Sequence, residues 1–318
     1  SVEEMYPLDF EEFLLAMGCG HEAIEGVREK FMARESLNES LHNYMLQQFK
    51  LYLLVGGLPE AVNKFLENRN MAHVRKVQRD IHTLYRIDAS QYDSERKLVI
   101  RKIYDMIPSN MENRKKRVVV KRIENTTGHK QFSDYAEEFE YLTNSGIALS
   151  VQAISNPKFP LLESENKNLL KLYMNDVGLL THLLYGTNIN AILRDENSVN
   201  LGSVYETVVA QELHAHGFVL HYYDNKQKGE VDYLIDDYEN LTVLPIEIKS
   251  GKDYKVHSVL DRFLQTSDYH IQKAVVLSNA REVSEKDGVM YLPIYYCMFY
   301  ERDKRADESE LIIPEITL

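Results

Sequence analysis

Two short segments place charged side chains on what the pattern predicts to be neighbouring strands. Residues 229–235 are Gly-Glu-Val-Asp-Tyr-Leu-Ile, and residues 245–249 are Pro-Ile-Glu-Ile-Lys. Apolar and charged residues alternate in the second segment, so the two-residue period of a strand turns Glu247 and Lys249 to one face. The polar stretch between the two segments is typical of a hairpin turn. The pattern therefore predicts a hairpin in which Asp232 lies beside Glu247 and Lys249.

Two carboxylates that point to one spot are typical ligands of a hard divalent cation, because Mg²⁺ prefers oxygen ligands and keeps several of its waters. A lysine beside them suits either the orientation or deprotonation of an attacking water, or the stabilisation of charge on a phosphate. A second interpretation stays open. Glu and Lys on an alternating strand also form a solvated sheet face with a cross-strand ion pair.

The residues that precede this hairpin predict a helix with an acid of its own. Ser203 is a candidate N-cap with Glu206 as its capping-box partner, and Gly217 is a natural stop. Glu206 therefore has two open roles, as part of the cap or as a third carboxylate at the metal site. Further along the chain, the pattern predicts three strands, a helix near residues 256–266 and a strand at 274–278.

This order of helix, three strands, helix and strand, together with the charged residues, resembles the core of the PD-(D/E)XK nuclease superfamily. The resemblance implies a restriction-endonuclease-like α/β domain with catalytic residues Glu206, Asp232, Glu247 and Lys249. It implies that Asp232, Glu247 and the carbonyl of Ile248 hold Mg²⁺ or Mn²⁺. In this interpretation Lys249 positions the hydrolytic water.

A second resemblance is carried by four phrases spread over nearly the whole chain. They are Met-Tyr-Pro-Leu-Asp-Phe-Glu-Glu-Phe-Leu at 5–14, Val-Gly-Gly-Leu-Pro-Glu-Ala-Val at 55–62, Leu-Tyr-Met-Asn-Asp-Val-Gly-Leu-Leu at 172–180, and Gly-Ser-Val-Tyr-Glu at 202–206. They resemble the C-terminal part of a family of prokaryotic AAA+-type ATPases that carry a nuclease-like domain of unknown function. The resemblance implies a multidomain α/β protein: a helical lid-like segment of the ATPase module at 1–90, a winged-helix-like domain at 91–160, and the nuclease-like domain at 161–318.

ATP is not expected to bind this chain, because no Gly-x-x-x-x-Gly-Lys-[Ser/Thr] motif occurs in it. The chain opens on Ser1 without a Met, and we expect a fragment whose ATPase core lies upstream in the same protein. Arg75, Lys76 and Arg79 share a predicted helix. A contact with nucleotide held upstream is one role for them, and a solvated face is the favoured one.

Several other side chains have local structural explanations. Asp9 is a candidate N-cap for the first helix, and Pro59 suits the first turn of a helix that follows the break at 56–57. Asp176 is favoured as an N-cap rather than as a catalytic acid.

Basic residues cluster ahead of a predicted amphipathic helix at 133–144. Residues 111–130 contain seven Lys or Arg and only two Glu, although the net charge of the whole chain is −12. The helix and the strand after it resemble a winged helix-turn-helix, but the polar face of the helix is acidic and would repel phosphates. We therefore favour a packing or spacing role for this part. If DNA binds here, we expect it to meet Arg114, Lys115, Lys116, Arg117, Lys121 and Arg122.

Composition narrows the setting. No apolar run approaches the roughly 20 residues that span a bilayer, and no signal peptide opens the chain, so no membrane partner is expected. Cys19 and Cys297 are far apart, so we expect a reducing cytoplasm.

Two functions stay open: a Mg²⁺- or Mn²⁺-dependent DNA phosphodiesterase, or an inactive nuclease-like fold that serves the upstream ATPase as an interaction or assembly module. An oligomer is compatible with either function.

Overall fold

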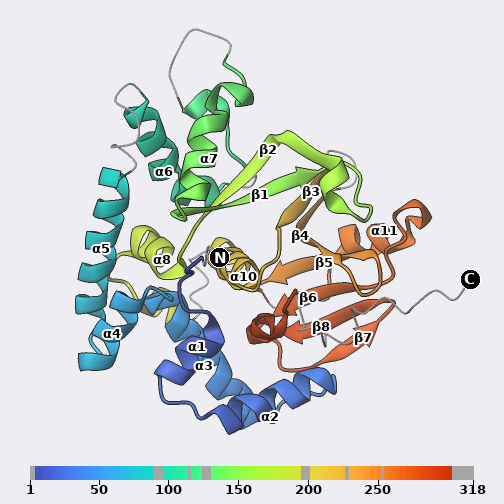
Figure 1. The fold of residues 1–318 in the computed structure, drawn as a ribbon. Coiled ribbons are helices and arrows are strands. Elements are labelled where there is room, and N and C mark those ends of the chain that lie inside the picture. The colour runs from blue at the N-terminus through green and yellow to red at the C-terminus, as the bar shows by residue number, and fades with distance from the viewer. Residues whose placement is uncertain are drawn as a thin grey trace, which may run out of the picture.

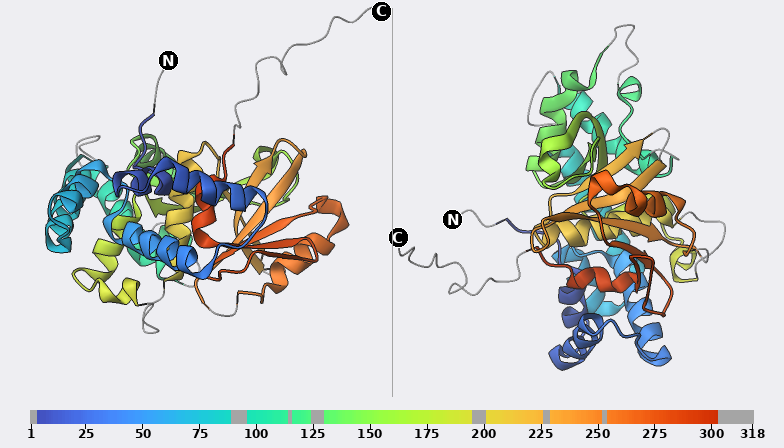
Figure 2. Two further views of the ribbon diagram at one scale, coloured as in Figure 1. Left: turned by 90° about the horizontal axis from the view of Figure 1, so that it is seen from below. Right: turned by 90° about the vertical axis from the view of Figure 1, so that its right-hand side faces the viewer.

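The computed structural model describes residues 4–88, 96–113, 116–123, 130–194, 201–225, 229–251 and 254–302. The described residues form a mixed α/β structure with one eight-stranded sheet (Figure 1). In the right-hand view of Figure 2 this sheet lies between two groups of helices, with α6 and α7 above it and α1 to α3 below it. None of the helices in the described ranges combines the length and apolarity that a bilayer crossing requires.

The N-terminal part is helical, as the sequence predicts. Its helices are α1 (Phe10–Ala16), α2 (His21–Met32), α3 (Glu39–Val55), α4 (Pro59–Asn68) and α5 (Met71–Asp88). The capping prediction for Asp9 is confirmed, because its Oδ1 accepts a 2.8 Å hydrogen bond from the backbone N of Glu12, whose carboxylate accepts one from the backbone N of Asp9. Pro59 occupies the first turn of α4, and Gly56 ends α3 with a φ of +76°.

Arg75 departs from the solvated face predicted for its helix. Lys76 and Arg79 are exposed on α5, whereas the Arg75 side chain is only 4% exposed. Its guanidinium turns inward against α3 and α8 (Val177–Tyr185), where it meets backbone carbonyls. The prediction is wrong for Arg75 because α3 and α8 cover the part of α5 from which its side chain extends.

The middle of the chain alternates short helices with the first strands. Its elements are α6 (Lys97–Met111), η1 (Val120–Arg122), η2 (Phe132–Tyr135), α7 (Ala136–Asn144), β1 (Ala148–Ile154), η3 (Leu161–Ser164), β2 (Glu165–Met174) and α9 (Asn190–Leu193). The amphipathic helix predicted at 133–144 is confirmed as η2 and α7 together.

The order predicted for the C-terminal part is also confirmed. It comprises α10 (Gly202–Ala215), β3 (His221–Asn225), β4 (Gly229–Asp237), β5 (Thr242–Lys249), α11 (Ser258–Gln265) and β6 (Ala274–Ser278). The chain continues into η4 (Ser267–Tyr269) ahead of β6, and into β7 (Ser284–Lys286), β8 (Val289–Pro293) and η5 (Ile294–Phe299) after it.

The strands lie in the order β2-β1-β3-β4-β5-β6-β8-β7. β1 pairs antiparallel with β2 and parallel with β3, in a register that sets Gln152 beside His221. The sheet therefore runs without a break across residue 160, where the sequence suggests a domain boundary. The hydrophobic core also extends across this position, because one buried cluster includes residues from Phe10 to Phe299.

Helix α10 is buried between the sheet and the N-terminal helices, near the centre of Figure 1. Every residue from Ser203 to Leu213 is buried, as expected of a helix that is covered on all sides. The capping box predicted for Ser203 and Glu206 is wrong. Leu201 is the N-cap, so Ser203 already lies inside the helix, and its hydroxyl donates a 2.6 Å hydrogen bond to Glu112.

Polar contacts join α10 to the helices on its other side. The backbone N of Phe10 and the Tyr52 hydroxyl both donate to Glu212 Oε1, at 2.9 and 3.0 Å. Gln211 donates to the Tyr52 oxygen at 2.7 Å and accepts from the backbone N of Val177 at 2.9 Å. Burial chiefly raises the pKa of Glu212, to about 8.

We expect Glu212→Gln to flatten the dependence of stability on pH. The unfolded chain releases the Glu212 proton near its ordinary pKa of 4.5, and the folded chain near 8. The stability that this carboxyl contributes is therefore complete below about pH 4.5 and is lost as the pH rises towards 8, by roughly 1 kcal/mol per pH unit. Urea unfolding at pH 5, 6.5 and 8 measures the effect. The exposed Glu67→Gln is the control, and equal slopes for Glu212→Gln and wild type would contradict the prediction.

We expect Gly178→Ala to destabilise the fold by about 3 kcal/mol through overpacking. A Cβ on Gly178 would lie 2.6 Å from the carbonyl oxygen of Val55 and 2.8 Å from the backbone N of Gly56, and neither backbone atom can move freely. Gly26→Ala is the matched control. Gly26 is an exposed residue of α2 with open space around it, so this change should stabilise the protein by about 1 kcal/mol. Chemical denaturation of both variants tests the pair.

Candidate functional site

The predicted hairpin forms, with β4 and β5 paired antiparallel from Asp237 opposite Thr242 to Tyr233 opposite Ile246. Asp232 lies just beyond the last of these pairs. Its Oδ2 accepts a 2.8 Å hydrogen bond from the backbone N of Ile248 on the opposite strand. The Asp232 carboxylate therefore reaches across to the Glu247-Ile248-Lys249 triplet.

A bulge in β4 aims Asp232 there. His221 pairs with Leu234 and Tyr223 with Val231, so two steps along β3 span three along β4. The extra residue interrupts the alternation of side chains, and Val231 and Tyr233 join different hydrophobic clusters. Bulges of this kind re-aim a side chain and are frequent beside active sites.

Glu247 and Lys249 lie on one face of β5, as the alternation predicts. Lys249 Nζ lies 2.7 Å from Glu247 Oε1, and both side chains are largely buried. The second oxygen of Glu247 is buried and has no hydrogen-bond partner among the described residues. One half of this carboxylate is therefore left without a neutralising contact.

Glu206 joins the group from α10. It is 5% exposed, its carboxylate forms an ion pair with Lys116, and it accepts a 3.3 Å hydrogen bond from the Tyr173 hydroxyl. The Tyr233 hydroxyl donates to the backbone carbonyl of Glu206 at 2.8 Å, which ties the helix to β4.

The electrostatics of the three acids reflect their proximity. Burial, and then the charges of Glu247 and Glu206, raise the pKa of Asp232 well above its usual range. Burial raises the pKa of Glu247 as well, although Lys249 opposes the rise. Burial alone would lower the pKa of Lys249, but the charge and hydrogen bond of Glu247, together with the charges of Asp232 and Glu206, outweigh burial and raise that pKa. The acids repel one another, and Lys249 is held in its charged form.

Two further lysines border the acids, and the sequence predicts neither of them at this place. Lys171 of β2 is 1% exposed, with Nζ 2.5 Å from Glu230 Oε1 and 4.5 Å from the centre of the Tyr222 ring. The one sequence feature that could have drawn attention to Lys171 is its charge between two leucines of an apolar strand. Lys116 was expected to meet DNA and instead pairs with Glu206, a contact that no local pattern encodes.

The remaining candidates lie elsewhere. Asp176 is fully buried and caps α8, accepting hydrogen bonds from the backbone N of Leu179 at 2.9 Å and of Gly57 at 2.7 Å. The N-cap prediction is confirmed. Burial chiefly raises the pKa of Asp176, to about 6.

Of the six residues expected to contact DNA, four are described, and two of these, Lys116 and Arg117, lie near the acids. The Arg117 side chain pairs with Asp224 at 3.2 Å. The backbone of Arg117 forms an isolated antiparallel β-bridge with Lys171 of β2. Lys121 and Arg122 are exposed on η1. Arg114 and Lys115 lie outside the described residues.

The donor set suits a hard divalent cation bound by few protein ligands. Over the described ranges, no three His, Cys, Asp or Glu side chains converge as a metal-binding group. Mg²⁺ is nevertheless commonly held through one or two carboxylates, with water completing the shell. Asp232, Glu247 with its unpaired oxygen, and the Ile248 carbonyl fit that smaller requirement, while Glu206 is engaged by Lys116.

Comparisons with known proteins give two matches of limited extent. Residues 46–190 match the model of a domain of unknown function, DUF8612, and residues 201–297 match that of a second, DUF4143. No curated protein and no solved structure matches the chain. The second match contains Glu206, the β4–β5 hairpin and Lys249. The C-terminal part of the chain is thus similar to a domain of unknown function that is found in AAA-ATPase-associated proteins.

Proposed function

We propose that the group around Asp232 is a divalent-metal-dependent phosphodiesterase centre that acts on DNA. The observation that carries this proposal is the meeting of Asp232 with Glu247 and Lys249 across the open end of the β4–β5 ladder. Acids buried in this way repel one another, and a bound cation would relieve that repulsion.

In this proposal Asp232, Glu247 and the Ile248 carbonyl hold Mg²⁺ or Mn²⁺, which would supply Lewis-acid polarisation of a phosphoryl oxygen and a more acidic bound water. The bond from the Ile248 backbone N fixes the Asp232 carboxylate. Lys249 acts as a hydrogen-bond donor that orients water and offsets charge on phosphate, because its raised pKa disfavours a role as a base. Glu206 is neutralised by its ion pair with Lys116, so it is not a metal ligand in this proposal.

DNA is the proposed substrate because basic side chains border the acids. Lys116 pairs with Glu206 and Arg117 lies beside Lys171, and the exposed Lys121 and Arg122 of η1 follow four to six residues later in the chain. Cations at the edge of a cleft attract phosphates locally even where the net charge is negative, as the −12 of this chain is.

We further propose that α10 and β3 to β6 correspond to a restriction-endonuclease-like core, and that the helices before β1 form a winged-helix-like unit. The sequence order supports the first, and the succession of α6, α7 and β1 supports the second. An ATPase domain upstream in the same protein is the proposed partner, because the C-terminal match is to a domain found in AAA-ATPase-associated proteins.

A second candidate is a catalytically inactive fold that serves that ATPase as an assembly module. The Lys116–Glu206 ion pair favours it, because the lysine occupies the helix acid that would otherwise be free for a metal. The core shared by the N-terminal helices and the sheet also suits a docking role. The two candidates differ in metal binding and in cleavage.

We expect millimolar Mn²⁺ to raise the melting temperature of the wild-type protein and to leave the melting temperature of the Glu247→Gln variant nearly unchanged. A ligand present at 100 times its Kd stabilises the folded state by about 2.7 kcal/mol, and Glu247→Gln removes a charged ligand. Glu285→Gln, on the edge strand β7, should respond as the wild type does. Equal shifts for all three proteins would show that Mn²⁺ binds elsewhere.

We expect the full ATPase-containing protein to cleave plasmid and linear DNA with Mn²⁺, and Lys249→Ala to slow cleavage at least about 100-fold. Lys286→Ala, an exposed lysine on β7, is the matched control and should cleave at the wild-type rate. Identical rates for wild type and Lys249→Ala would reject the enzyme. Metal binding without any cleavage would instead favour the assembly module.

A further inference from the structure

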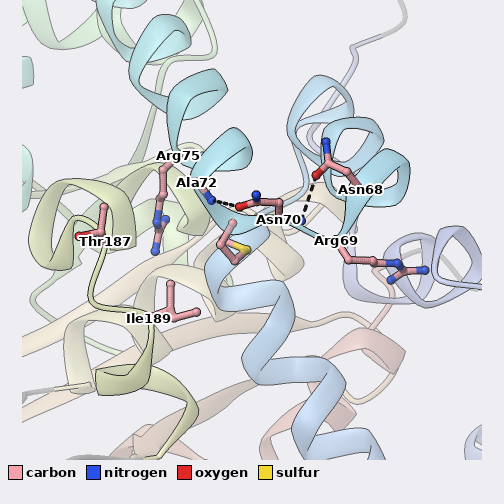
Figure 3. Close-up of a pocket in the computed structure, with 8 residues that line it drawn as sticks. Asn68, Arg69, Asn70, Ala72, Arg75, Thr187 and Ile189 are labelled. Atoms are coloured by element: carbon pink, nitrogen blue, oxygen red, sulfur yellow. Dashed lines mark hydrogen bonds between the residues drawn. The ribbon is translucent and has the colours of Figure 1, made fainter.

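A pocket of about 550 Å³ opens between the α4–α5 turn and the loop that follows α8 (Figure 3). Its walls include Asn68, Asn70 and Ala72 on one side, and Thr187 and Ile189 on the other. It lies apart from the acids around Asp232 and shares no lining residue with them. No carboxylate occurs among the described residues that line it.

Arg75 projects into this region, and three of its five N–H donors have no partner among the described residues. In Figure 3 its guanidinium extends from α5 towards Ile189, beside Thr187. Nη1 lies within hydrogen-bond distance of four acceptors, which include Gln78 Oε1 at 2.7 Å and Thr181 Oγ1 at 3.2 Å. Nε and Nη2 are buried and have no partner among the described residues.

These two nitrogens make up one edge of the planar guanidinium, and this edge is the one that matches two oxygens of a carboxylate or phosphate. A buried donor without a partner destabilises the fold, and more so when it is charged. The bonds of Nη1 to α3 and α8 hold the group in place, so the unpaired edge is already oriented.

Basic side chains lie around Arg75. Burial lowers the pKa of His182 to about 4, and the charges of Arg75, His82 and Arg79 add to this effect. The negative charge of Asp176 acts on Arg75. The Asp176 oxygens, however, already accept hydrogen bonds from the backbone N of Gly57 and of Leu179. Arg69 does not supply further charge to the pocket, because its guanidinium packs on the Phe65 ring and contacts Met17.

We propose that this pocket binds a compact oxyanion group, a phosphate or a carboxylate, through the Nε–Nη2 edge of Arg75. The first turn of α5 is a minor contributor, because Asn70 Oδ1 already accepts from the backbone N of Ala72. The anion reaches the buried edge by a small displacement of the side chains that line the pocket. This inference does not depend on the proposed phosphodiesterase.

Titration of the protein with inorganic phosphate and, separately, with acetate at low ionic strength tests the proposal. The readout is the Arg75 Nε–H resonance, identified by its loss in Arg75→Lys. We expect a saturable shift of that resonance with at least one of the two anions, and the one that acts identifies the oxyanion.

Ala72→Glu and Ala72→Gln separate pocket binding from surface binding. A glutamate in the first turn favours the helix, so the fold is kept while a negative charge enters the wall of the pocket. We expect Ala72→Glu to weaken binding about tenfold and Ala72→Gln to leave it within about twofold. An Arg75 resonance that neither anion moves, or binding that Ala72→Glu leaves unchanged, overturns the proposal.

Discussion

The buried Asp176 carboxylate joins the halves of this chain, and the arrangement of the acids depends on it. It accepts from Gly57 in the turn between α3 and α4 and from Leu179 in α8. The next residue, Val177, donates to Gln211 of α10. Since α10 also carries Glu206, the N-terminal helices take part in setting where that acid lies. The segment at 5–14 reaches the same junction, because the backbone N of Leu8 donates to the Gly57 carbonyl at 2.8 Å.

Features encoded by neighbouring residues could be predicted from the sequence. The helix caps of Asp9 and Asp176 need only the residues that follow them, and both are present. The order of elements after residue 202 follows from hydrophobic period and turn residues, as does the hairpin that brings Asp232 to Glu247. These elements have local signals strong enough to survive folding.

Features that depend on distant partners could not be predicted. Ser203 looks like an N-cap, but the N-cap is Leu201, two residues earlier. Arg75 looks solvated, but α8 covers it. The bulge that re-aims Asp232 arises from pairing with β3. Lys116 reaches Glu206 from 90 residues away in the chain. The periodicity of a single sequence does not encode contacts between distant residues. The environment of the acids could therefore be seen only in the folded structure.

The parallel pairing of β1 with β3 has a practical meaning for how this protein can be divided. A shortened chain that starts after residue 160 would lack β1, which lies between β2 and β3. Strand β2, the carrier of Lys171, would then have no neighbour, and β3 would present open backbone groups along its length. Open edges of this kind recruit other chains and promote aggregation. Dissection of the C-terminal part must therefore retain the strand at 148–154 if the piece is to stay monodisperse.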